Sequence, residues 1–186
     1  ARRRGAARFV QMSALGVHTG CGAAYGETKA RGSNVLSSSP IPTCVVEPSI
    51  LFSDRSEIVR ALSLLAGLPF LPFPQIPAAF RPIHTADAAR LLADAVTADT
   101  LPRRLPLGGP QRLTFTEVAS AYLEPRGTTL LLLPRGVSRL LVSLLSVMKI
   151  PGLPSELDAM LAIDNAGDPP TSPEELIRFT DWSLPP

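Results

Sequence analysis

Short apolar runs alternate with segments of helical period along most of this 186-residue chain. The first apolar run, residues 8–13, is followed by a glycine-rich turn at 16–22 and a helical segment at about 23–38. A second apolar run, 43–47, stops at Pro48. Strands that alternate with helices are typical of a parallel sheet with helical crossover connections. The sequence therefore predicts the α/β fold class.

Local signals predict the remaining elements. Helices are expected at 56–66, 85–96, 134–148 and 155–163, and extended segments at 81–84, 104–107 and 128–133. Pro106 places the segment 104–107 at a sheet edge, because proline cannot donate a ladder hydrogen bond. Two capping boxes predict helix starts, one at 114–117 for a helix to about residue 123 and one at 172–175. The four prolines between 68 and 77 predict an extended loop.

The composition limits the classes of function. With 45% hydrophobic and 18% charged residues, the chain can bury one sizeable core. A net charge of +2 and 5% aromatic residues do not provide the basic, aromatic stripe of a nucleic-acid binder. Cys21 and Cys44 are the only cysteines and predict no disulfide framework. No Cys/His/Asp cluster with metal-ligand spacing accompanies His18 or His84, so a metal site is not expected. No apolar run reaches the length of about 18 residues that a membrane-spanning helix needs.

Tyr25 and Lys29 are four residues apart within the first predicted helix. Residues at positions i and i+4 lie on the same helix face. A lysine in this place can hydrogen-bond the hydroxyls of a nucleotide ribose and favour the tyrosinate form of its neighbour, which makes the tyrosine a better proton donor or acceptor. The pair therefore indicates redox chemistry on a carbonyl or an alcohol. The alternative is an incidental pair on a surface helix.

A dinucleotide site of this kind normally includes a G-x-G-x-x-G turn after a first strand, and the chain contains none. The sequence begins with an arginine-rich stretch that runs directly into the first apolar run. We therefore expect the chain to begin in the middle of its fold.

Four ordered blocks, at 12–16, 25–29, 45–52 and 81–89, resemble the atypical and extended short-chain dehydrogenase/reductases. Among these, the chain is most similar to the nucleotide-binding accessory subunit of mitochondrial complex I and its bacterial relatives. The resemblance covers about residues 8–182. It implies a Rossmann-like parallel sheet without its first βαβ unit in residues 1–110, which include a proline-rich loop at 67–82. A small, mainly helical subdomain and tail would follow in 111–186.

The resemblance also implies roles for single residues. Tyr25 matches the proton donor and Lys29 the ribose-binding lysine, while Ser13 matches the serine that hydrogen-bonds a substrate carbonyl. A turn that touches the nicotinamide end of the cofactor is matched by Pro48, Ser49 and Ile50. The implied cofactor is NAD or NADP, with NADPH favoured, bound weakly or not at all by this stretch of chain alone. Ala14 and Glu47 depart from the pattern of active relatives, which commonly have a hydroxyl residue and an arginine there.

The sequence leaves three functions open. The first is an accessory subunit of a large respiratory or membrane-associated assembly, on the matrix side of the mitochondrial inner membrane in a eukaryote and otherwise in the cytoplasm or a plastid. The second is a working NAD(P)H-dependent reductase or epimerase that acts on a small molecule. The third is an interaction module that has lost its cofactor. For Ser13 the alternative role is to cap a turn. Asp87 is expected to be a structural acid at a helix start, with a catalytic role as the alternative. His84 is expected to be structural, and the alternative is a contact with a substrate or a partner. The apolar stripe at 137–148 fits core packing or a contact face.

Overall fold

Three parallel strands form the main sheet of the computed structural model, which describes residues 5, 7–22, 24–134, 136–138, 140, 166–167 and 175–184. Strands β1 (Phe9–Met12), β2 (Thr43–Pro48) and β7 (Arg104–Leu107) lie in the order β1–β2–β7. Val10 pairs with Cys44, and Val46 pairs with Leu105. β2 is the central strand, and every residue after Thr43 in it is buried. The predicted parallel sheet is confirmed, and so is the edge position of β7.

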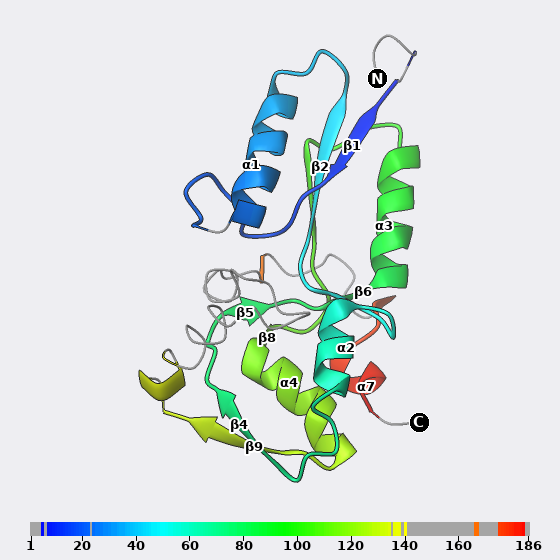
Figure 1. Cartoon of the computed structure of the whole chain (residues 1–186). Coiled ribbons are helices and arrows are strands. Elements are labelled where there is room, and N and C mark those ends of the chain that lie inside the picture. The colour runs from blue at the N-terminus through cyan, green and yellow to red at the C-terminus, as the bar shows by residue number, and fades with distance from the viewer. Residues whose placement is uncertain are drawn as a thin grey trace.

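Helices lie on opposite faces of this sheet (Figure 1). α1 (Ala24–Ser37) connects β1 to β2, and Val45 of β2 lies on the α1 side. Cys44 points the other way and packs with Ala88 of α3 (Thr85–Thr97), the helix that precedes β7. Because the strands are parallel and follow one another in one direction, connections on opposite faces must have opposite hands. One of the two connections is therefore left-handed, and of the described helices only α1 lies on its face of the sheet.

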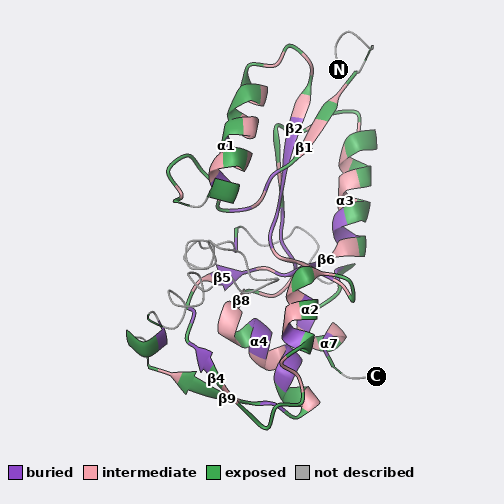
Figure 2. Ribbon diagram, in the orientation of Figure 1, coloured by how far each residue is buried: buried purple, intermediate pink, exposed green. Residues whose placement is uncertain are grey.

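The chain between β2 and α3 and the chain after β7 together form a second region, which contains three pairs of short strands. The parallel pairs are β3 (Leu51–Phe52) with β6 (Ile83–His84) and β4 (Phe70–Pro74) with β9 (Thr129–Leu133), and the antiparallel pair is β5 (Ala79–Phe80) with β8 (Leu113–Thr114). The helices here are α2 (Glu57–Ser63), α4 (Phe115–Leu123), a short 3₁₀ turn η2 (Glu124–Arg126) and α7 (Phe179–Trp182). They surround one apolar cluster, which we call the α4 core (Figure 2). Its buried members are Phe52, Val59, Leu62, Phe73, Val118, Ala119, Tyr122, Leu123 and Phe179.

The last described segment, residues 175–184, is held by both regions. The Asp87 carboxylate at the start of α3 accepts a hydrogen bond of 2.8 Å from the backbone N–H of Ile177. The Phe179 ring lies 5.1 Å from the Phe52 ring, edge to face, inside the α4 core. The Arg126 guanidinium donates to the carbonyl oxygen of Ser183. This segment therefore joins the sheet region to the α4 core.

The proline-rich loop predicted at 67–82 is wrong in its central part, because residues 70–74 form strand β4. The N–H of Thr129 donates to the carbonyl oxygen of Pro69, so the backbone carbonyl of residue 69 faces β9. The backbone polar groups of residues 71 and 73 share that direction, so those of Pro72 and Pro74 face the other edge of β4, which pairs with no strand among the described residues. Proline at that edge breaks no ladder bond.

The other predicted elements at residues 8–133 are confirmed within a few residues of their expected ends. The first capping box is also confirmed: the Thr114 hydroxyl accepts from the N–H of Glu117, and the Glu117 carboxylate accepts from the N–H of Thr114. The predicted helix at 155–163 lies outside the described residues, as do most of the helix at 134–148 and of the capping box at 172–175. Among the described residues, no helix is long and apolar enough to cross a membrane.

Candidate functional site

The carboxyl ends of β1 and β2 meet at one edge of the sheet. The N–H of Ser13 donates to the carbonyl oxygen of Val46 at 2.7 Å, and the N–H of Ser49 donates to that of Leu107 at 2.8 Å. Ser13 and Ser49 therefore follow neighbouring strands, as their predicted roles require. Ligands of open parallel sheets bind at this edge.

Tyr25 and Lys29 lie on one face of α1. The Lys29 ammonium is 5.6 Å from the centre of the Tyr25 ring, and Tyr25 is 49% exposed. The Lys29 Nζ also donates to the carbonyl oxygen of Met12 at 3.1 Å. The structure thus brings the predicted pair together and ties it to the residue before Ser13. The catalytic roles of the three residues stay predictions.

Ser13 is only 4% exposed, and its hydroxyl makes no hydrogen bond among the described residues. A buried hydroxyl without a partner costs free energy, of the order of 1–3 kcal/mol. The cost is removed if a ligand supplies the missing partner. The alternative prediction, that Ser13 caps the following turn, is wrong, because a capping side chain would have a hydrogen bond to a backbone group and the Ser13 hydroxyl has none among the described residues.

The predicted cofactor turn is built into the backbone between β2 and β3. Pro48 is buried at the end of β2, and its carbonyl oxygen accepts from the N–H of Leu15 at 3.0 Å. The Ser49 hydroxyl accepts from the N–H of Arg81 at 3.0 Å, and the Ile50 carbonyl accepts from the N–H of Ile83 at 2.9 Å. The turn therefore has a fixed conformation.

Arg81 is a candidate that the sequence did not indicate. Its Nε is buried without a hydrogen-bond partner among the described residues, while its Nη1 lies 3.5 Å from the carbonyl oxygen of Pro110. Its carbonyl accepts from the N–H of Gly109, where a Cβ atom would overlap the carbonyl oxygen of Pro82. Only glycine allows this approach. A lone arginine between Phe80 and Pro82 in an apolar stretch was the available signal.

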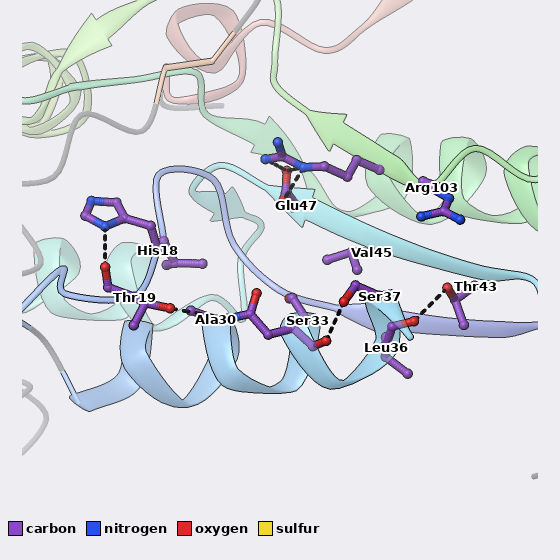
Figure 3. Close-up of a pocket in the computed structure, with 13 residues that line it drawn as sticks. His18, Thr19, Ala30, Ser33, Leu36, Ser37, Thr43, Val45, Glu47 and Arg103 are labelled. Carbon is purple, nitrogen blue, oxygen red and sulfur yellow. Dashed lines mark hydrogen bonds and ion pairs between the residues drawn. The ribbon is translucent and has the colours of Figure 1, made fainter. Parts of the chain in front are cut away.

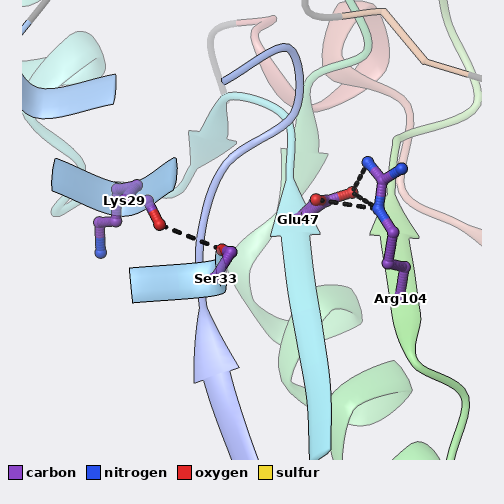
Figure 4. Close-up of polar contacts among 4 residues, drawn as sticks. All are labelled: Lys29, Ser33, Glu47 and Arg104. Atoms are coloured by element: carbon purple, nitrogen blue, oxygen red, sulfur yellow. Dashed lines mark hydrogen bonds and ion pairs between the residues drawn. The ribbon is translucent and has the colours of Figure 1, made fainter. Parts of the chain in front are cut away.

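Glu47, one of the two departures from the family pattern, is a buried carboxylate with a single cationic partner among the described residues (Figure 4). Arg104 of β7 donates through Nη2 at 2.7 Å and through Nε at 3.2 Å. The hydrogen bonds to Glu47 raise the pKa of the Arg104 guanidinium above its ordinary value. The pair joins β2 to β7 next to the cofactor turn.

His84 and Asp87 have structural roles, as predicted. The Nδ1 atom of His84 accepts from the N–H of Ala86 at 3.3 Å and so caps α3, and Asp87 holds the N–H of Ile177. The part of the chain that the structure describes contains no group of three or more potential metal-ligating side chains.

A groove of about 520 Å³ lies beside α1, and Glu47 and Arg104 are among its lining residues (Figure 3). It is lined by α1, by the α1-facing side of β2 and by Arg103 and Arg104. None of the predicted site residues lines it. It is therefore not the predicted nicotinamide site.

No protein-family model matches the chain, and no curated protein matches it. Solved structures do. A nucleoside-diphosphate-sugar epimerase from Staphylococcus aureus matches 100% of this chain and 67% of its own, with a TM-score of 0.74 and 18% identity. A dTDP-4-dehydrorhamnose reductase from Clostridium acetobutylicum matches 67% of this chain and 49% of its own, with a TM-score of 0.57 and 18% identity. A UDP-glucose 4-epimerase from Thermus thermophilus, in complex with NAD, matches 72% of this chain and 52% of its own, with a TM-score of 0.53 and 18% identity.

These similarities establish the fold. The chain has the mixed α/β architecture with parallel strands that these proteins share, and it spans about half to two thirds of their length.

Proposed function

We propose that this protein binds a nicotinamide dinucleotide at the carboxyl ends of β1 and β2 and acts as a reductase or epimerase on a small-molecule alcohol or carbonyl. One observation carries the proposal. The Ser13 hydroxyl is buried without a partner among the described residues, and the carbonyl of the preceding residue, Met12, accepts from the Lys29 ammonium beside Tyr25. The structural neighbours support it, because their names describe epimerases and a reductase.

The side chains at this site fit the nicotinamide and ribose end of such a cofactor. Lys29 has three donors and uses one on Met12, which leaves donors for ribose hydroxyls. The cofactor turn, Pro48 to Ile50, offers backbone in a fixed conformation. When bound, the nicotinamide supplies a hydride donor or acceptor. Weak binding by this stretch alone, and a preference for NADPH, stay predictions.

Each catalytic side chain then has one task. The Ser13 hydroxyl donates to the substrate oxygen, and Tyr25 transfers a proton to or from that oxygen. The positive charge of Lys29 stabilises negative charge that develops on the Tyr25 oxygen. The unpartnered Nε of Arg81 is a donor for an anionic group of the substrate.

Binding can be tested with purified protein by titrating NADH and NADPH in a calorimeter. We expect Lys29→Met to weaken binding by about tenfold, since one charge-assisted hydrogen bond is worth about 1.4 kcal/mol or more. Val35→Ala, at a 72% exposed position of the same helix, is the matched control and should bind like the wild type. Equal affinities for all three proteins would contradict the proposed site.

Catalysis is tested separately with a panel of sugar nucleotides and simple ketones. Tyr25→Phe should keep nucleotide affinity and lower turnover by about a hundredfold or more, as expected for loss of a general acid. Full turnover by this variant would remove Tyr25 from the mechanism.

The finer role implied by the sequence resemblance, in a complex I type of assembly, gains no support from the structural neighbours. Co-purification of the protein with a large respiratory complex would revive it. Failure of both nucleotides to bind would favour the interaction module instead.

A further inference from the structure

The groove beside α1 exists because the connection from β2 to β7 changes face. α3 packs on the far side of the sheet, so the α1 side of β2 and β7 has no second helix over it among the described residues. The resulting hollow of about 520 Å³ is within the size range of small-molecule pockets. Its chemistry indicates what it can hold.

One end of the groove is cationic and organised in advance. The Glu47 side chain is 8% exposed and holds Arg104 through Nε and Nη2, while the Arg104 side chain is 71% exposed. The Nη1 group of Arg104 therefore has no partner among the described residues. The Arg103 guanidinium also makes no hydrogen bond or ion pair with any described residue. Two arginines and one carboxylate leave one positive charge uncompensated.

The wall formed by α1 and the start of β2 is polar (Figure 3). The hydroxyls of Ser33, Ser37 and Thr43 donate to backbone carbonyls of α1 at 3.1, 2.7 and 3.5 Å. A hydroxyl that donates once can still accept from another group. The wall thus offers acceptors for hydroxyl groups of a ligand, close to a cationic end that suits an anion.

We propose that this groove is a second binding site, for a small hydroxyl-bearing molecule whose phosphate or carboxylate group pairs with Arg103 and the free edge of Arg104. A planar guanidinium held by a buried carboxylate loses little freedom when it binds an anion. The site shares no lining residue with the proposed nicotinamide site, and the inference does not depend on that function.

The test uses calorimetric titration of the whole chain at low ionic strength with three sugars. Glucose 1-phosphate carries a phosphate, glucuronate carries a carboxylate, and glucose carries neither. We expect saturable binding of at least one anionic sugar, about tenfold or more tighter than binding of glucose, and the tighter of the two identifies the anionic group.

Matched variants locate the binding. Arg103→Gln should lower the affinity for the anionic sugar by about tenfold. The variant should fold normally, because the Arg103 side chain makes no hydrogen bond or ion pair with a described residue. Arg60→Gln, at an exposed position of α2, should leave affinity unchanged. An added saturating concentration of NADH should not compete.

Three results would overturn the proposal. They are the lack of saturable binding by either anionic sugar at millimolar concentration, equal affinity in Arg103→Gln and Arg60→Gln, and competition by NADH, which would assign the sugar to the other site. If the groove binds a protein partner and not a small molecule, neither anionic sugar should bind saturably, which is the first of these results.

Discussion

α1 and α4 are helices of the same small protein that are held in place by different forces. α4 buries four of its nine residues, which are Val118, Ala119, Tyr122 and Leu123. α1 is longer, with 14 residues, yet it buries only Gly26 and Ala30. Polar contacts hold it instead, including the bond from Lys29 to the Met12 carbonyl and the bond from the Gly20 N–H to Glu27.

This difference separates stability from binding. Burying one large apolar side chain contributes about 1.5–3 kcal/mol, whereas a hydrogen bond contributes about 1 kcal/mol. α4 therefore contributes more free energy of apolar burial than α1 does. α1 keeps Tyr25 and Lys29, the groove and its hydroxyls accessible to ligands.

The largest expected effect is in the α4 core. Phe52 is 0% exposed and packs against Phe179, so Phe52→Ala should lower the free energy of unfolding by about 3–5 kcal/mol, the usual range for a buried phenylalanine. Val35→Ala on α1 should change it by less than about 0.5 kcal/mol, because Val35 is 72% exposed. Urea unfolding measures both. Similar losses of unfolding free energy in the two variants would contradict the difference between the α4 core and α1.

The next effect concerns two adjacent arginines at the edge of the sheet. Arg104→Gln removes the cation bonded to the buried Glu47 and should cost about 1–2 kcal/mol, less than for a fully buried pair because water reaches Arg104. Arg103→Gln breaks no bond with a described residue and should cost close to nothing. Unfolding curves at pH 7 give the two values. Identical stabilities would show that the Glu47 pair contributes little to the sheet region.

A smaller effect tests the cap of α4. Thr114→Ala should cost about 1 kcal/mol at pH 7, as for other N-caps. Hydrogen bonds from the backbone N–H and hydroxyl of Thr114 lower the pKa of Glu117. A lowered pKa in the folded state means that the stabilisation is present above the ordinary pKa of glutamate and is lost as the pH falls through the folded value.

The stability difference between wild type and Glu117→Gln should therefore shrink below a pH of about 4. A difference that is constant between neutral and acidic pH would exclude the capping carboxylate as its source.

The smallest effect is a difference in thiol reactivity. Burial, followed by the nearby charge of Glu47, raises the pKa of Cys44, which is 0% exposed. Cys21, in the glycine-rich turn before α1, is partly exposed. A thiol reagent at pH 8 should label Cys21 in the native protein and Cys44 only after denaturation, because the thiolate is the reactive form. Labelling of Cys44 at the Cys21 rate in the native protein would mean that the sheet opens readily. Cys21→Ser gives the Cys44 rate alone.

Much of the fold follows from the sequence because its signals are local. The apolar runs and the Thr114–Glu117 capping box set the element limits, and the spacing of Tyr25 and Lys29 predicts their contact. Strand β4 was not predicted because the number of prolines suggested a loop. Pro72 and Pro74 are two residues apart, so both face the edge of β4 that pairs with no described strand.

The groove and Arg81 could not be predicted from local pattern. The groove depends on which face of the sheet α3 covers, which is settled by long-range packing of Cys44 and Ala88. The Arg81 side chain, whose Nε is buried, packs closely against Gly108, which lies far along the chain. The groove has no signal in neighbouring residues, and for Arg81 the available local signal is an arginine within an apolar stretch.

The segment 175–184 has a consequence for how the protein forms in the cell. Phe179 is buried in the α4 core, and the Ile177 N–H bonds to Asp87 at the start of α3, so residues translated early complete their contacts only after residues translated late are available. On the ribosome, the nascent chain would expose Phe52 and its apolar neighbours until this segment leaves the exit tunnel. Chaperones would find their binding surface there, and a premature stop codon before residue 175 would leave that surface permanently open.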